Sequence, residues 1–506
     1  MKNKLILGTL FLTLSGLTTR VIGFFYRIFL SNALGAKTLG VYQLIFPVYG
    51  ICFTIFASGI QTALSKLIAE AESLRDTKRS HRYFLDAVLL SVGSALLLSV
   101  LLFFGSGIVA KHYLKEIACT ESLRLLSLAF PFCGITSCVH GYCYGIKRAF
   151  IPATSQLAEQ SVRVCFLFTI SALLPVTCEL AIIALLAGEI FSCLYCITGT
   201  VILKHKMQDG ARPLPSEKSG RSLADMKSLL RISLPLTSNR LFINVLHSFE
   251  TFIVPLTLRR FGLSRDDALS IFGILTGMTM SFLMFPGTLT NSLSVLLLPA
   301  ISEADAQQNR ERLSHAVSVS VKYSVLLGLS AGFLFFFFGE ELGTVVFSEK
   351  RAGTYLACLS FLCPFLYVST TFSSILNGLG RMNLTFLSSV IGLSMRVILF
   401  GVLIPRYSVY GYFISLMTSQ LFMNLFDLAL IRRTVPFTFN AVSSIVTPSI
   451  ILLATASFFF RAYEFLCART TLHHLLLLVI CCGLMALVSL ILFAVTGIIR
   501  RSELHA

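Results

Sequence analysis

Residues 126–132 read Leu-Ser-Leu-Ala-Phe-Pro-Phe, and 233 positions later residues 359–365 read Leu-Ser-Phe-Leu-Cys-Pro-Phe. The correspondence continues without a gap as far as Arg163 and Arg396. Both copies are apolar enough to lie within a lipid bilayer, yet each keeps one arginine inside its apolar run. A repeat that carries a charge into hydrocarbon predicts a transporter made of two similar halves around a polar cavity.

The composition places the chain in the class of membrane proteins. Of its 506 residues, 55% are apolar and 13% are charged, and the mean hydropathy is +0.82. A soluble domain carries about 25% charged residues. Because the apolar residues form continuous runs of about 18 or more, they indicate helices rather than a barrel. We therefore predict an all-α polytopic membrane protein with about 14 transmembrane helices.

The predicted helices group into two lobes of six. The N-terminal lobe covers 1–203, a cytoplasmic linker covers 204–231, and the C-terminal lobe covers 232–433. Two extra helices and a cytoplasmic tail follow over 434–506. Because six is even, both lobes begin on the same side of the membrane, which predicts a pseudo-two-fold axis along the membrane normal. The fourteen predicted spans are 6–30, 39–64, 84–109, 122–146, 151–174, 180–203, 232–257, 268–299, 322–338, 353–377, 383–404, 410–431, 440–460 and 473–499.

The basic residues report on orientation in the membrane. With the N-terminus inside, the predicted cytoplasmic segments hold an excess of Lys and Arg over the external loops, so both termini are predicted to be cytoplasmic. The net charge of +17 then reflects topology and does not indicate a nucleic-acid partner. The one Cys-x-x-Cys pair, Cys193 and Cys196, lies in an apolar span without a nearby histidine. We expect these cysteines to be packing residues, and we predict neither a metal nor a cofactor.

Two apolar spans each carry a polar stripe along one face. In span 6–30, Arg20 and Arg27 recur with small and hydroxyl residues at spacings of three and four. Span 232–257 repeats this pattern, with Glu250 beside its stripe. Such spacings place each set on one helix face, and a polar face is unstable against lipid. We therefore predict a polar cavity whose substrate-binding residues are Arg20, Arg27, Arg240, Asn244, His247 and Glu250.

Structural roles compete with this interpretation. Arg20 and Arg27 could instead extend to the membrane interface or pair with a structural carboxylate such as Glu250 or Glu189. Arg163 and Arg396 either line the cavity or make repeat-related packing contacts. Glu189 also fits a hydrogen bond between two helices.

An arginine-lined cavity favours an anionic substrate. Guanidinium groups make bidentate contacts with phosphate and carboxylate and stay charged at any relevant pH, so phosphate or pyrophosphate is the natural candidate. A cavity for cations would need acidic residues, and Glu250 is the one acidic residue on these faces. The sequence has no G-x-x-x-x-G-K-[ST] motif for ATP. His247 and Glu250, about one helical turn apart, are a candidate pair for coupling to a proton or cation.

The first seventy residues resemble a known family. Residues 16–27 read Gly-Leu-Thr-Thr-Arg-Val-Ile-Gly-Phe-Phe-Tyr-Arg, and residues 39–47 read Leu-Gly-Val-Tyr-Gln-Leu-Ile-Phe-Pro. With residues 59–70, they look like the opening of the stage V sporulation protein B family. That family groups with polysaccharide and lipid II flippases in the multidrug/oligosaccharidyl-lipid/polysaccharide exporter superfamily. The resemblance implies a lipid-linked sugar moved from the inner to the outer leaflet by alternating access. It also implies that Arg20 and Arg27 contact the pyrophosphate and that the last two helices form a groove for the lipid tail.

We therefore predict a flippase or exporter of the bacterial plasma membrane, and not an enzyme, that serves cell-wall, spore-cortex or polysaccharide biosynthesis. Its predicted partners are a polyprenyl-pyrophosphate-linked substrate, the bilayer, and a coupling cation or proton. A multidrug or cation antiporter of the same fold is the first alternative. A membrane glycosyltransferase or polymerase is the second, but it would need carboxylates or a metal site on a sizeable external loop, and the predicted external loops are short.

Overall fold

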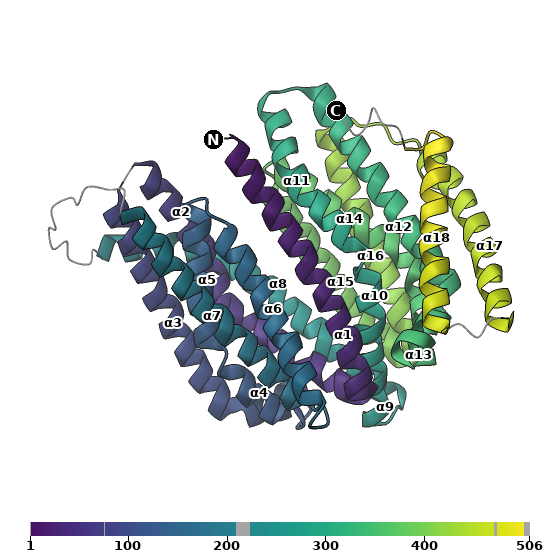
Figure 1. Cartoon of the computed structure of the whole chain (residues 1–506), viewed down its shortest axis with the longest axis horizontal. Coiled ribbons are helices and arrows are strands. Elements are labelled where there is room, and N and C mark those ends of the chain that lie inside the picture. The colour runs from purple at the N-terminus through teal and green to yellow at the C-terminus, as the bar shows by residue number, and fades with distance from the viewer. Residues whose placement is uncertain (1, 75, 209–222, 470–472, 500–506) are drawn as a thin grey trace. The chain divides into compact units, whose positions relative to one another are not determined.

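The computed structural model describes residues 2–74, 76–208, 223–469 and 473–499, and every regular element within them is helical (Figure 1). The predicted linker, 204–231, lies partly outside the described residues. Where it is described, it is helical, because α7 continues to Gln208 and α8 begins at Leu223. The first eight α-helices are α1 Lys2–Phe53, α2 Gly59–Ser73, α3 Thr77–Ile108, α4 Cys119–Ser127, α5 Phe130–Gly145, α6 Phe150–Ser171, α7 Cys178–Gln208 and α8 Leu223–Phe261.

The other described elements are five short helical segments along the whole chain and the α-helices that follow α8. Five further segments, η1 to η5, are single turns of π- or 3₁₀-helix next to the α-helices. They are η1 Thr54–Ser58, η2 Val109–Leu114, η3 Ile274–Thr279, η4 Ser360–Leu362 and η5 Val442–Val446. The remaining α-helices are α9 Arg265–Gly273, α10 Met280–Met284, α11 Gly287–Ala306, α12 Arg310–Phe347, α13 Lys350–Leu359, α14 Cys363–Gly378, α15 Met382–Tyr407, α16 Val409–Thr434, α17 Thr447–Arg469 and α18 His474–Val495.

The helices form two compact units whose boundaries fall inside helices. Unit 1 comprises Met1–Tyr26 and Ala33–Phe252, and unit 2 comprises Arg27–Asn32 and Ile253–Ala506. Residues 223–252 of α8 therefore pack with unit 1, although the predicted second lobe begins at residue 232. The lobe boundaries given above stay a prediction.

The internal packing of each unit follows the sequence repeat. In unit 1, α5 packs against α2, α3 and α7, and α6 packs against α7. In unit 2, α14 packs in the same way against α11, α12 and α16, and α15 packs against α16. The helices that hold Arg163 and Arg396, α6 and α15, are thus equivalent members of the two repeats.

The membrane-spanning character predicted from hydropathy is present in the helices. Among the described residues, eleven helices are long and apolar enough to cross a membrane, and twelve when the bent pair α4 and α5 is taken as one span. Two further features account for the difference between these twelve spans and the fourteen that the sequence predicts. The stretch Leu14–Ser73 is 60 residues long and contains two predicted spans, which Gly35 separates with its positive φ of 71°. Helix α6, 22 residues long, coincides with the predicted span 151–174.

Small residues allow helices in unit 2 to approach closely. A Cβ atom on Gly328 of α12 would lie 2.4 Å from the Pro364 Cα atom of α14, and one on Gly343 would lie 2.1 Å from the Gly353 nitrogen of α13. Such contacts replace the hydrophobic driving force that helices lack inside a bilayer. The two C-terminal helices, α17 and α18, pack on α12 and share an apolar core with it through Leu452, Leu478 and Phe338 (Figure 1).

Candidate functional site

The polar stripe of α8 contacts η1, the short segment that follows α1. The Arg240 Nη1 atom donates to the carbonyl oxygen of Ser58 at 2.7 Å and to its Oγ at 2.6 Å. One turn on, the Asn244 Nδ2 atom donates to the Thr54 Oγ1 atom at 2.5 Å. This segment is a single π-helical turn, a feature that often marks functional positions in helices. The structure therefore brings Arg240 and Asn244 to one face of unit 1.

Gly59, directly after η1, permits this close approach. A Cβ atom at this position would lie 2.0 Å from the Thr237 Oγ1 atom and 2.9 Å from the Ser233 carbonyl oxygen. The Ser248 hydroxyl donates to the Pro47 carbonyl at 3.4 Å and extends the contact toward α1. Arg240 as a residue is nonetheless exposed, and a guanidinium has further N–H groups besides those that meet Ser58.

His247 and Glu250 form a pair on the same helix. The His247 Nδ1 atom lies 3.2 Å from the Glu250 Oε2 atom. The histidine side chain is 54% exposed and the glutamate side chain is 18% exposed. The imidazole and the carboxylate are thus within hydrogen-bond distance of each other on one face of α8.

Arg20 and Arg27 are both exposed on α1. Two small residues of α1 contact α6 instead. The Ser15 hydroxyl donates to the Ala153 carbonyl of α6 at 2.7 Å, and a Cβ atom on Gly23 would lie 3.6 Å from the Gln160 amide nitrogen. Arg20 belongs to unit 1 and Arg27 to unit 2, so their joint action on one pyrophosphate stays a prediction.

Arg163 lies in a charged cluster inside unit 1. Its Nη2 atom is 2.6 Å from the Glu159 Oε1 atom, and the two side chains are 16% and 21% exposed. Glu189, which is buried, lies within electrostatic range of Arg163. The Tyr49 hydroxyl donates to the Glu189 Oε1 atom at 3.4 Å. This cluster of one arginine and two carboxylates places Arg163 and Glu189 together inside unit 1. Whether Arg163 or Glu189 also lines a cavity stays a prediction.

Glu159 and Tyr49 were not among the predicted site residues. A signal for Glu159 was present in the sequence, because an acidic residue four positions before an arginine faces it on a helix. Tyr49 had no comparable signal, since α1 and α7 are far apart in the sequence.

Arg396, the equivalent residue in unit 2, hydrogen-bonds to two neutral side chains of the next helix, α16. Its Nε atom donates to the Ser419 Oγ atom at 2.9 Å, and its Nη2 atom donates to the Gln420 Oε1 atom at 3.0 Å. In the repeat, Gln420 occupies the position of Glu189. In both repeats the arginine therefore lies near a polar side chain of the following helix. The two sites differ in charge, because Glu189 is acidic and Gln420 is neutral.

The described residues hold no group of three or more His, Cys, Asp or Glu side chains in an arrangement suited to a metal ion. The exposed charges of the two predicted stripes are instead mainly basic. Arginine in this setting can bind phosphate or carboxylate through bidentate hydrogen bonds.

Comparisons with known proteins agree with the fold and with the resemblance of the first seventy residues. Residues 5–305 match the family model described as polysaccharide biosynthesis protein, and residues 241–403 match a model described as MatE. Stage V sporulation protein B of Bacillus subtilis (strain 168) is 26% identical over 444 residues, which cover 86% of this chain and 85% of that protein.

Two further comparisons involve flippases. The lipid II flippase MurJ of Bacillus subtilis (strain 168) is 20% identical over 469 residues, which cover 87% of this chain and 85% of that protein. A solved structure of lipid II flippase MurJ in an inward closed conformation has a TM-score of 0.69 at 12% identity and covers 96% of this chain and 99% of its own. The likeness to the solved structure confirms the predicted all-α polytopic fold class.

Proposed function

The chain belongs to the polysaccharide biosynthesis protein family, and we propose that it is a flippase. Its proposed substrate is a polyprenyl-pyrophosphate-linked oligosaccharide or peptidoglycan precursor, which it carries across the bacterial plasma membrane by alternating access. Two relatives support this proposal, stage V sporulation protein B and a lipid II flippase. The named activity of the second is transport rather than catalysis, which agrees with a protein that is not an enzyme.

One structural observation carries the proposal. Arg240, an exposed residue of the apolar membrane helix α8, has its guanidinium held beside η1. Insertion of an arginine near the bilayer centre costs at least about 2.5–3.5 kcal/mol on insertion scales. We therefore expect an arginine at such a position to have a function or a partner. The two hydrogen bonds to Ser58 orient the side chain and leave other N–H groups for an anion. We assign phosphate binding to Arg240, supported by Asn244, and to Arg20 and Arg27 on α1.

Coupling to an ion gradient is assigned to the pair His247 and Glu250. The two side chains lie 3.2 Å apart, and the histidine is the more exposed of the two. In this proposal a proton or cation reaches His247 first and is held there beside the carboxylate of Glu250. This coupling role is a proposal that goes with the flippase.

The alternative is a multidrug or cation antiporter of the same fold, which the MatE match over residues 241–403 favours. A cation site would need carboxylates on the stripes of α1 and α8. Glu250 is the one described acidic residue on these stripes, against Arg20, Arg27 and Arg240. The excess of basic side chains favours the flippase.

A leaflet-accessibility assay separates these two functions. The purified protein is placed in liposomes that contain a fluorescent lipid II analogue, and an impermeant reagent reports how much analogue lies in the outer leaflet. We expect faster exchange between leaflets than in protein-free liposomes. A matched liposome assay of ethidium movement tests the antiporter. Ethidium transport without movement of the lipid-linked analogue would refute the flippase.

Topology provides a second expected outcome. With cytoplasmic termini, Lys227 at the start of α8 is expected to lie inside the cell, and Asp266 at the start of α9 is expected to lie outside. Both residues are exposed. In a cysteine-depleted protein in whole cells, an impermeant maleimide should label Asp266→Cys but not Lys227→Cys. Labelling of Lys227→Cys alone would reverse the proposed orientation, and permeabilised cells provide the control for reactivity.

A further inference from the structure

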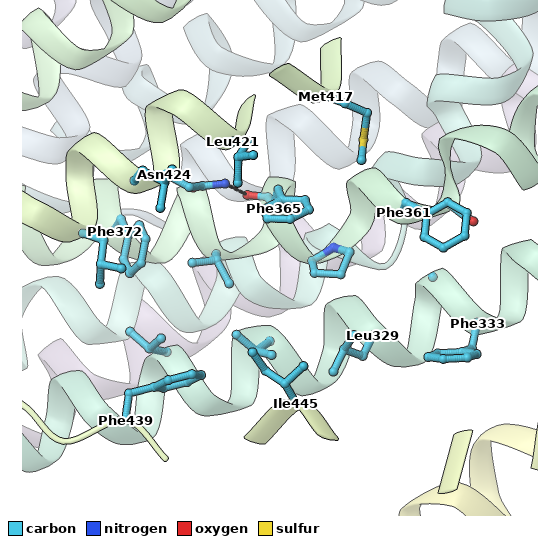
Figure 2. A pocket seen from close by; sticks show the side chains of 18 of the residues that line it. Leu329, Phe333, Phe361, Phe365, Phe372, Met417, Leu421, Asn424, Phe439 and Ile445 are labelled. Carbon is cyan, nitrogen blue, oxygen red and sulfur yellow. Dashed lines mark hydrogen bonds between the residues drawn. The ribbon is translucent and has the colours of Figure 1, made fainter. Parts of the chain in front are cut away.

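Unit 2 contains a large apolar groove that the proposed transport site does not use. Its volume is about 610 Å³, which falls within the range of about 300–1,000 Å³ found for small-ligand sites. The groove is lined by α12, α14 and α16, and by the chain between α16 and η5 (Figure 2). Figure 2 shows Leu329 and Phe333 on one side and Met417 and Leu421 on the other.

The groove runs along the helices. On α16 its lining residues extend from Met417 to Arg432. At a rise of 1.5 Å per residue, these fifteen steps correspond to about 22 Å, which is most of the hydrocarbon thickness of about 30 Å. A groove of this length fits an extended fatty acyl chain.

The residues that line the groove are mostly apolar and offer few hydrogen-bond partners to water. Aromatic rings, including Phe333, Phe361, Phe365 and Phe439, provide much of the surface. The main polar group in the middle of the groove is Asn424, which is 6% exposed and whose Nδ2 atom donates to the Phe365 carbonyl at 2.8 Å. Protein interiors are close-packed, and water in a cavity needs two to four polar partners. A hydrocarbon chain is therefore the occupant that matches these walls.

One end of the groove is basic. Arg432 lines it, is exposed, and has its guanidinium carbon 5.9 Å from the centre of the Phe437 ring. This contact places the guanidinium beside Phe437, which also lines the groove. The neighbouring Arg433 is also exposed but does not line it. Basic groups between membrane helices at the end of a span bind anionic lipid head groups.

We propose that this groove binds one anionic phospholipid of the bilayer, with an acyl chain between α12, α14 and α16 and its phosphate at Arg432. The length of the groove accommodates the chain, and the arginine selects the charge of the head group. None of the described residues that line the groove belongs to α1 or α8, and the proposal does not depend on the flippase function.

Native mass spectrometry of the full chain in detergent tests this site, with phosphatidylglycerol and phosphatidylcholine of matched acyl chains as probes. We expect one phosphatidylglycerol per protein to be retained in preference to phosphatidylcholine. In Arg432→Ala the apparent affinity for phosphatidylglycerol should fall about fivefold, as expected for one basic residue near an anionic head group. Arg433→Ala is the matched control and should bind as the wild type does.

A second variant fills the groove without removing charge. Leu421 is 43% exposed and lines the groove, so Leu421→Trp should displace the lipid while the melting temperature stays unchanged. Equal retention of the two phospholipids, or equal losses in Arg432→Ala and Arg433→Ala, would overturn the proposal. So would displacement of phosphatidylglycerol by an equimolar amount of undecaprenyl phosphate, which would assign the groove to the tail of the transported lipid. Lipid II movement, measured separately on the wild type, tests the flippase.

Discussion

Arg20→Ala is expected to abolish movement of a lipid-linked precursor while the protein remains folded and inserted in the membrane. The side chain is exposed, whereas α1 packs against α6 through Ser15 and the backbone around Gly23. Alanine therefore removes charge without removing packing. A hydrogen bond to a charged group contributes about 1.5–3 kcal/mol, so substrate affinity should fall about tenfold to a hundredfold. The leaflet-accessibility assay and the melting temperature are measured on the same preparation.

Two variants sharpen this test. Arg20→Lys should restore transport in part, since a lysine keeps the charge but loses the bidentate contact with phosphate. Thr18→Ala is the matched control, because Thr18 is also exposed on α1 and its hydroxyl donates to the Leu14 carbonyl of the same helix at 2.9 Å. A purely structural role predicts instead that abundance, melting temperature and transport decrease together. Full transport by a stable Arg20→Ala/Arg27→Ala double mutant would rule out the proposed phosphate contact.

Arg163→Gln is expected to destabilise unit 1 strongly. The substitution leaves Glu159 and Glu189 in a mostly buried cluster without their arginine. Breaking a buried ion pair by removing one partner costs about 3–5 kcal/mol, because an uncompensated charge remains away from water. The melting temperature in a mild detergent, followed by tyrosine fluorescence or by loss of the monodisperse peak after heating, measures this effect.

The repeat supplies the control for Arg163. Arg396→Gln removes the equivalent side chain of unit 2, whose hydrogen bonds go to Ser419 and Gln420, so it should cost less. The double mutant Glu159→Gln/Arg163→Gln should recover part of the lost stability, since it removes a negative charge together with the positive one. Equal destabilisation by Arg163→Gln and Arg396→Gln would show that the two carboxylates do not decide the effect.

The sequence alone determined the helical class and the repeat. Continuous apolar runs oblige the backbone to satisfy its own hydrogen bonds, and only helices do this within one segment. The pairing of Arg163 with Arg396 also followed from the sequence, and the equivalent positions of α6 and α15 in their units agree with it. These features depend on local composition and spacing, so they are readable before any tertiary contact is known.

The partners of the polar side chains were decided by the tertiary structure. The sequence placed Arg240 and Asn244 on one helix face, but their contacts with Ser58 and Thr54 depend on the π-helical turn η1 and on Gly59, almost two hundred residues earlier. It left Arg163 open between a cavity and a structural role, and the neighbours of Arg163 inside unit 1, Glu159 and Glu189, follow from the packing of α6 and α7. Helical periodicity tells which residues share a face. What that face meets depends on how distant helices pack, and a pattern of spacings along one helix does not contain this information.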